Sequence, residues 1–285
     1  MKKPRNPDPS RAVHEEIARR ILRFRELIAA SRRSPSPANI HDLRVSIRRL
    51  AAAVALCRDI ADDSRSRAAR ASIKKLITPL GRLRDLHVQR DIVALAGSAR
   101  TPLIAGFLEL LAKEIRRETG VARAAIRSFG MRPVDLFAQA AERIRAGGPR
   151  RAKVSRQALA RMLRRRLAKA DRCRERYLRT GKMRDFHALR MAYKHLRYFA
   201  ELMAAAEPCV TRGEVERVHA VQRRMGVVHD MHLLGERLAS SGGARAPDTG
   251  ALRLMAQKEN SLRASCDRTL ARFTPFAKLQ EILYE

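Results

Sequence analysis

The chain has 285 residues and carries 61 Lys and Arg against 29 Asp and Glu, which gives a formal net charge of +32. Its 45% hydrophobic content supplies enough apolar surface for one or two cores, which excludes a largely disordered chain. Aromatic residues make up only 4% and Trp is missing, which disfavours the base-stacking platforms of single-strand-binding proteins. An excess of cations this large destabilises a compact chain through self-repulsion, so it indicates a polyanionic partner.

The cysteines and the N-terminal segment indicate the cellular compartment in which the protein is expected. The four cysteines, Cys57, Cys173, Cys209 and Cys266, lack the paired short spacing of a disulfide scaffold or a zinc knuckle. Segment 1–20 is basic and lacks the apolar region of a signal peptide. No stretch approaches the roughly 18 apolar residues that a membrane span needs. We therefore expect a cytoplasmic protein that does not enter a membrane.

Apolar residues recur at helical spacing along almost the whole chain, and no segment shows convincing strand alternation. The sequence predicts helices at 11–31, 38–61, 64–96, 102–130, 134–146, 152–179, 184–206, 212–240, 248–273 and 276–283. Ser10 is the expected N-cap of the first helix, and Thr78-Pro79-Leu80-Gly81 is expected to kink or interrupt the third. Gly147-Gly148-Pro149 is the strongest break, and 241–248 is expected to be a flexible loop.

Two pairs of segments repeat at almost the same offset. HDLRVSIRRLAAAVAL at 41–56 aligns with HALRMAYKHLRYFAEL at 187–202, an offset of 146 residues. LGRLRDLHVQ at 80–89 aligns with MGVVHDMHLL at 225–234, an offset of 145 residues. Two blocks that share nearly one offset indicate an internal duplication.

The duplication predicts an all-α architecture of two antiparallel four-helix bundles, related by a pseudo-two-fold axis. We expect a single domain over 1–285, built of repeat one at 10–147 and repeat two at 148–285.

The first repeated block carries a cationic stripe. His41, Arg44 and Arg48 lie at positions i, i+3 and i+7, which places them within about 60° of one another on a helix. The second block repeats this pattern at the equivalent positions His187, Arg190 and Lys194. One such stripe is often a solvated helix face, but its recurrence at matching positions favours a shared anion that bridges the charges.

Four segments together resemble a known family. HDLRVSIRRL, LGRLRDLHV, HALRMAYKHLRY and VQRRMGVVHDMHLL resemble, in order, the signature segments of the CHAD family, the conserved histidine α-helical domain. The resemblance covers about residues 10 to 283. It implies an all-helical domain of two four-helix bundles with a basic central cavity or groove. It also implies binding of inorganic polyphosphate there, and localisation of some members to polyphosphate granules.

The resemblance implies polyphosphate-binding residues in both halves of the chain. Carried over position by position, they are His41, Arg44, Arg48, Arg49, Arg84, His187, Arg190, Lys194, Arg197 and His229. The chain departs from the family pattern at Ala51, where members usually have a basic residue. The internally equivalent position, Arg197, keeps its charge, so the first half is expected to hold the anion less tightly there.

Protonation of histidine is expected to favour binding. A bound phosphate would stabilise the charged forms of His41 and His187. We therefore expect affinity to increase as the pH falls through the ordinary range of histidine.

A metal-dependent phosphohydrolase is one alternative, because the chain has two His-Asp dipeptides, at 41–42 and 229–230. The internal repeat argues against it, since His229 aligns with Arg84 and Arg is not a usual metal ligand. Both residues can donate hydrogen bonds to phosphate. We expect no catalytic residues, no metal and no cofactor, and we do not expect an enzyme.

Non-specific nucleic-acid binding is the second alternative, because a net charge of +32 attracts any polyanion. No helix-turn-helix, zinc-finger or RNA-recognition signature is present. The run Arg164–Arg166, with Arg161 and Arg172–Arg176 nearby, forms a basic helix surface. That surface either widens the electrostatic footprint or is simply solvated, and the sequence leaves both interpretations open. The sequence does not indicate an oligomeric state.

Overall fold

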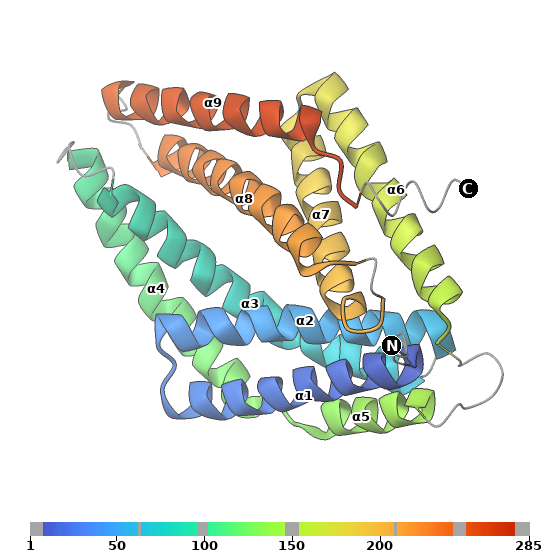
Figure 1. Cartoon of the computed structure of the whole chain (residues 1–285). Coiled ribbons are helices and arrows are strands. Elements are labelled where there is room, and N and C mark those ends of the chain that lie inside the picture. Colours follow the sequence, from blue (N-terminus) through green and yellow to red (C-terminus); the bar gives the residue numbers. More distant parts are fainter. Residues whose placement is uncertain are drawn as a thin grey trace.

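The computed structural model describes residues 8–61, 64–95, 102–145, 154–207, 210–241 and 249–276. Within those residues all regular structure is α-helical (Figure 1), so the expected all-α class is confirmed. The nine helices are α1 (Pro9–Arg33), α2 (Pro37–Ala61), α3 (Ser64–Leu95), α4 (Pro102–Ser128), α5 (Arg132–Arg145), α6 (Arg156–Thr180), α7 (Met183–Met203), α8 (Arg212–Ser241) and α9 (Thr249–Arg272).

Local capping explains where several helices begin and end. The Asp8 side chain accepts a hydrogen bond from the backbone N–H of Ser10 at 3.3 Å, and Pro9 occupies the first turn. The expectation that Ser10 is the N-cap is therefore wrong, because its hydroxyl instead donates to the Val154 carbonyl at 3.2 Å. At the end of α6, Gly181 has a φ of 62°, the left-handed conformation typical of a C-terminal cap.

The sequence predicts a kink or an interruption at Pro79; helix α3 continues through this residue, so it is not interrupted there. Proline removes one backbone donor from the helix ladder. In the preceding turn, the Thr78 hydroxyl donates a hydrogen bond to the Lys74 carbonyl at 3.1 Å. Leu76 and Leu80, on either side of Pro79, are buried in the core.

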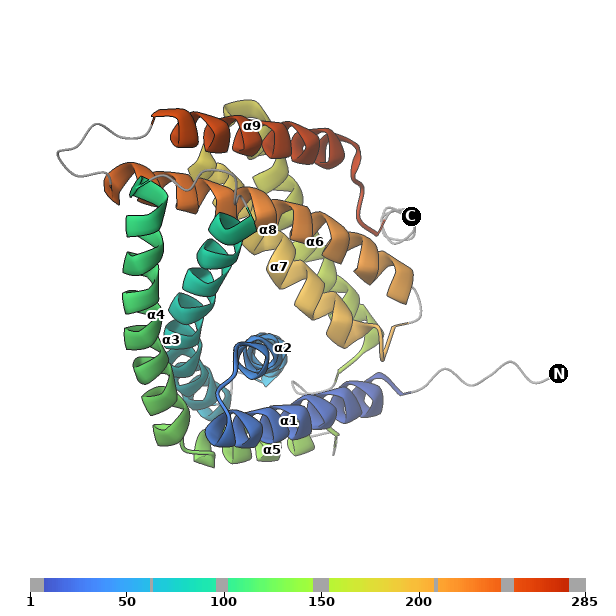
Figure 2. The same cartoon turned by 90° about the vertical axis from the view of Figure 1, so that its left-hand side faces the viewer.

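The helices form two groups that share their apolar cores. Helices α1–α5 pack together, α6–α9 pack together, and the groups meet where α2 contacts α7 and α3 contacts α8 (Figures 1 and 2). The main core contains buried side chains from both groups, including Leu43 and Leu189. A second cluster joins Leu86 of α3 and Phe107 of α4 to Leu234 of α8.

The architecture agrees with the predicted order of helices, with the short helix at 134–146 found as α5. The repeated blocks lie on α2 and α7, and on α3 and α8, so equivalent sequences occupy the helices that contact across the two groups. The duplication and its pseudo-two-fold axis remain an interpretation of the sequence. The predicted break at 147–149 and the helix at 276–283 fall wholly or almost wholly outside the described residues, as does most of the loop at 241–248.

Candidate functional site

The two cationic stripes meet where α2 packs against α7. On α2, Leu43 and Ile47 are fully buried, and this fixes the rotation of the helix that carries His41, Arg44 and Arg48. On α7, Leu189 is buried in the same way, and the helix carries the second stripe, His187, Arg190 and Lys194. Two stripes that are 146 residues apart in sequence therefore lie at one junction between helices.

Helices α3 and α8 complete this site. Helix α3 contributes Arg84 and Asp85, and α8 contributes His229 and Asp230. The Nη2 atom of Arg44 lies 3.8 Å from Oδ1 of Asp85, and the His187 and His229 rings lie 5.0 Å apart between centroids. We call the following residues the central cluster: His41, Arg44, Arg48, Arg84, Asp85, His187, Arg190, Lys194, His229 and Asp230.

The central cluster concentrates positive charge in a partly buried place. Burial, followed by the charges of Arg48, Arg190 and Arg44, lowers the pKa of Lys194 to about 7. Burial and then Arg48 lower the pKa of Arg44 to about 10, although Asp85 opposes them. These shifts have the direction expected when like charges crowd together away from water. A bound anion would relieve that repulsion.

The histidines of the cluster are affected by the same cations. Burial and then Arg84 lower the pKa of His41, while burial and then Arg190 lower the pKa of His187. Burial, Arg190 and His187 together lower the pKa of His229 to about 4. Before an anion binds, these imidazoles are therefore mainly neutral at pH 7, each with one N–H donor. The expected role for charged histidine is shifted to a lower pH range.

Two guanidinium N–H groups of the central cluster lack a hydrogen-bond acceptor within the described part of the chain. The Nε atoms of Arg44 and Arg48 are buried, and neither has a hydrogen-bond partner among the described residues. Buried donors are normally satisfied, because leaving one unpaired destabilises the fold by about 1–3 kcal/mol. Arg44 is only 7% exposed, so an acceptor can reach its Nε only if neighbouring side chains move aside. Oxygen atoms of an anion are suitable acceptors for both.

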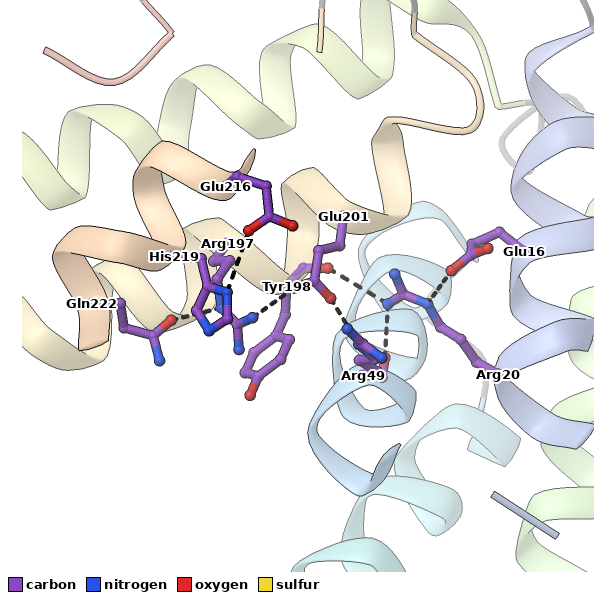
Figure 3. A network of polar contacts seen from close by, with 9 residues as sticks. All are labelled: Glu16, Arg20, Arg49, Arg197, Tyr198, Glu201, Glu216, His219 and Gln222. Atoms are coloured by element: carbon purple, nitrogen blue, oxygen red, sulfur yellow. Dashed lines mark hydrogen bonds and ion pairs between the residues drawn. The ribbon is translucent and has the colours of Figure 1, made fainter. Parts of the chain in front are cut away.

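Two of the residues implied by the family resemblance, Arg49 and Arg197, lie in another network (Figure 3). The Nε of Arg49 donates to one carboxylate oxygen of Glu201 at 2.9 Å, and Nη1 of Arg197 donates to the other at 2.7 Å. The Nε of Arg197 also donates to Gln222 at 2.7 Å. Both arginines thus share one carboxylate, which offsets one of their two positive charges. The structure brings together the other eight residues and separates these two from them.

The Glu201 network lines a cavity of about 800 Å³ between α1, α2, α7 and α8. Arg20 of α1, which the sequence analysis did not single out, is 5% exposed and holds this network together. It donates to Glu16 at 2.7 Å and to the backbone carbonyl of Arg49 at 3.0 Å. The i,i+4 spacing of Glu16 and Arg20 is visible in the sequence, but the contact of Arg20 with the backbone carbonyl of Arg49 depends on the packing of α2 against α1.

Tyr198 connects the two regions. Its side chain is buried, and its phenol influences the pKa of both Arg44 and Arg190, which places it beside the central cluster. Figure 3 shows the ring pointing away from the Glu201 carboxylate. The tyrosine therefore forms part of the wall between the central cluster and the cavity.

The surroundings of the His-Asp pairs do not resemble a metal site. Among the described residues, no group of three or more His, Cys, Asp or Glu side chains gathers as metal ligands would. His41 is surrounded by Arg84, Arg44 and Arg48, whereas Asp42 lines the cavity of the Glu201 network. A metal cation at His41 would therefore be repelled by its neighbours.

The family model and the solved structure that match this chain both belong to one family. A family model described as the CHAD domain matches residues 15–239. The crystal structure of the CHAD domain from the plant Ricinus communis superimposes with a TM-score of 0.67 and 17% sequence identity, covering 96% of both chains. No curated protein matches. Within the described part of the chain, no helix combines the length and apolar character needed to cross a membrane.

Proposed function

The chain belongs to the CHAD domain family, and we propose that it binds inorganic polyphosphate in the central cluster between α2, α3, α7 and α8. One observation carries the proposal: eight cationic or imidazole side chains from four helices converge there, and among the described residues the carboxylates that act on them are Asp42, Asp85, Asp91 and Asp230. Polyphosphate is a flexible line of closely spaced anions without base edges. A continuous group of forked donors is sufficient to bind it.

The composition of the cluster favours this ligand over nucleic acid. Tyr198 is the only Phe, Tyr or Trp that we place beside the cluster, and its side chain is 3% exposed. Binding of single strands usually uses exposed aromatic rings on which bases stack. The proposed site instead offers guanidinium and imidazole donors, which suit phosphate oxygens.

We propose a binding protein rather than an enzyme. The cluster holds donors and positive charge but no nucleophile paired with a base, and the His-Asp pairs are separated or surrounded by arginine. Location in the cytoplasm, with recruitment to polyphosphate granules, follows as a prediction from the ligand.

The proposal is tested by removing one guanidinium from each stripe. In the double variant Arg44→Gln, Arg190→Gln, we expect affinity for polyphosphate to fall by at least about 100-fold, because each lost charged hydrogen bond contributes about 1.5–3 kcal/mol. Isothermal titration calorimetry measures the affinity, and circular dichroism checks that helicity is retained.

The matched control is Lys113→Gln, Arg116→Gln, which removes two exposed cations from α4. The control should bind within about threefold of the unmodified protein. If the Arg44 and Arg190 variant also binds that well, the central cluster is not the site.

Competition separates polyphosphate from nucleic acid. At equal phosphate concentration, duplex DNA should fail to displace a labelled long-chain polyphosphate from the protein. Displacement by DNA at that concentration would make nucleic acid the preferred partner, since both ligands share the non-specific electrostatic attraction.

A further inference from the structure

A second line of cations runs along α6, outside the central cluster. Six exposed residues lie within about 80° of one another on a helical wheel and span about 27 Å of helix. We call them the α6 stripe: Arg161, Arg165, Lys169, Arg172, Arg176 and Arg179. Of the basic surface expected from Arg164–Arg166, Arg161 and Arg172–Arg176, the stripe contains Arg161, Arg165, Arg172 and Arg176, whereas Arg164 and Arg166 lie on other sides of the helix.

Among the described residues, the cations of the α6 stripe are unpaired, as are exposed cations of α4, but only the α6 stripe lies on a helix that packs against α7 of the central cluster. None of the six forms an ion pair with a described residue. Exposed arginines elsewhere commonly pair within their own helix, as Arg11 does with Glu15 and Arg217 does with Glu214, each at 2.8 Å. Repulsion along an unpaired stripe disfavours the free protein, and a linear polyanion lying on it would remove that repulsion.

The α6 stripe is connected to the central cluster through His195 of α7. Helices α6 and α7 pack against each other, and His195 is exposed next in sequence to Lys194 of the cluster. His195 is exposed on one side and packed on the other; this partial burial, followed by the charges of Lys194, Lys169 of the stripe and Arg166, lowers its pKa. Cations of the cluster and of the stripe therefore lie close enough to act on one imidazole.

We propose that a long polyphosphate chain leaves the central cluster past Lys194 and His195 and continues along the α6 stripe. This inference rests on the function proposed above and adds chain length as the property that the protein distinguishes. A short chain would occupy the central cluster alone. A long chain would also contact the α6 stripe, and the added contacts act at the high effective concentration of a tethered ligand.

The test compares two chain lengths and two sets of substitutions. The stripe variant is Arg165→Gln, Lys169→Gln, Arg172→Gln, Arg176→Gln. The control variant, Lys113→Gln, Arg116→Gln, Arg123→Gln, Arg127→Gln, removes the same charge from exposed positions on α4 that also form no ion pair with a described residue. Affinity is measured for tripolyphosphate and for polyphosphate of about 100 phosphates, at several salt concentrations.

We expect the stripe variant to bind the long chain at least about tenfold more weakly than the control, with a smaller salt dependence. Both variants should bind tripolyphosphate equally. Equal long-chain affinity in the two variants would overturn the α6 inference while leaving the central cluster intact. The inference would also be overturned if the stripe variant bound single-stranded DNA more weakly than the control but bound the long polyphosphate equally well, because the stripe would then be a site for nucleic acid. Failure of the Arg44 and Arg190 variant to lose tripolyphosphate binding would instead refute the proposed function.

Discussion

Burial and three neighbouring guanidinium groups lower the pKa of the Lys194 ammonium group. With a pKa of about 7, Lys194 is about half protonated at neutral pH in the free protein. A bound phosphate stabilises the protonated form, so its binding raises the pKa of Lys194 and takes up a proton. Lysine, rather than histidine, is therefore the group expected to couple binding to pH near neutrality.

This coupling predicts how affinity changes with pH. Because the pKa of Lys194 is about 7 in the free protein and higher in the complex, the contribution of Lys194 to polyphosphate affinity should be fully developed below pH 7. It should fall as the pH rises from 7 to 9, by at most tenfold per pH unit for this one proton. The histidines act at lower pH, because their pKa values are lowered in the free protein.

The variant Lys194→Arg separates the contribution of Lys194 to the pH dependence from the contributions of the histidines. Lys194→Arg keeps the positive charge throughout the range, so the fall between pH 7 and 9 should disappear. Calorimetric titrations in buffers of different ionisation enthalpy measure the proton uptake directly. The same pH profile in the variant and the unmodified protein would show that Lys194 does not titrate on binding.

At the scale of single helices, periodicity was sufficient to predict the elements and the faces of the two stripes. Arg49 is one position, or about 100°, from Arg48, so its separation from the stripe follows from helix geometry. Arg197 is different: its spacing of seven from Arg190 predicts the same face. Its side chain nevertheless pairs with Glu201 and Gln222. Glu201 follows Arg197 by four residues on α7, so that pair is visible in the sequence, whereas the contact with Gln222 depends on the packing of α8 on α7.

Helix α3 provides a test of how the scaffold supports the site. Pro79 lies inside α3, five residues before Arg84, and leaves one backbone carbonyl of the helix without its usual donor. Pro79→Ala should therefore raise the free energy of unfolding by about 1–2 kcal/mol. Urea denaturation followed by circular dichroism measures this change, with Thr78→Ala as a neighbouring control. A lower stability in Pro79→Ala would show that the local geometry imposed by proline is needed for α3 to pack.

At the scale of the whole molecule, the net charge of +32 has a defined distribution. Part of it is neutralised in ion pairs such as Arg49 with Glu201, part is concentrated in the central cluster, and part lies exposed on α6. The sequence predicted the cluster because the same spacing recurs in both halves. It did not predict the depressed pKa of Lys194 or the buried Nε atoms, because both depend on contacts between helices that are far apart in sequence.

The junction of the two helix groups makes the site a property of the complete fold. Helices α2 and α3 provide half of the donors, and α7 and α8 provide the rest.

A crystal structure of the protein with a short polyphosphate tests the central claim most directly. We predict phosphates between α2 and α7, with oxygen atoms within hydrogen-bond distance, about 3 Å, of Arg44, Arg48 and Arg190. The two buried Nε atoms should both have acceptors. Phosphates bound only in the cavity beside Glu201, with the central cluster unchanged, would contradict the account.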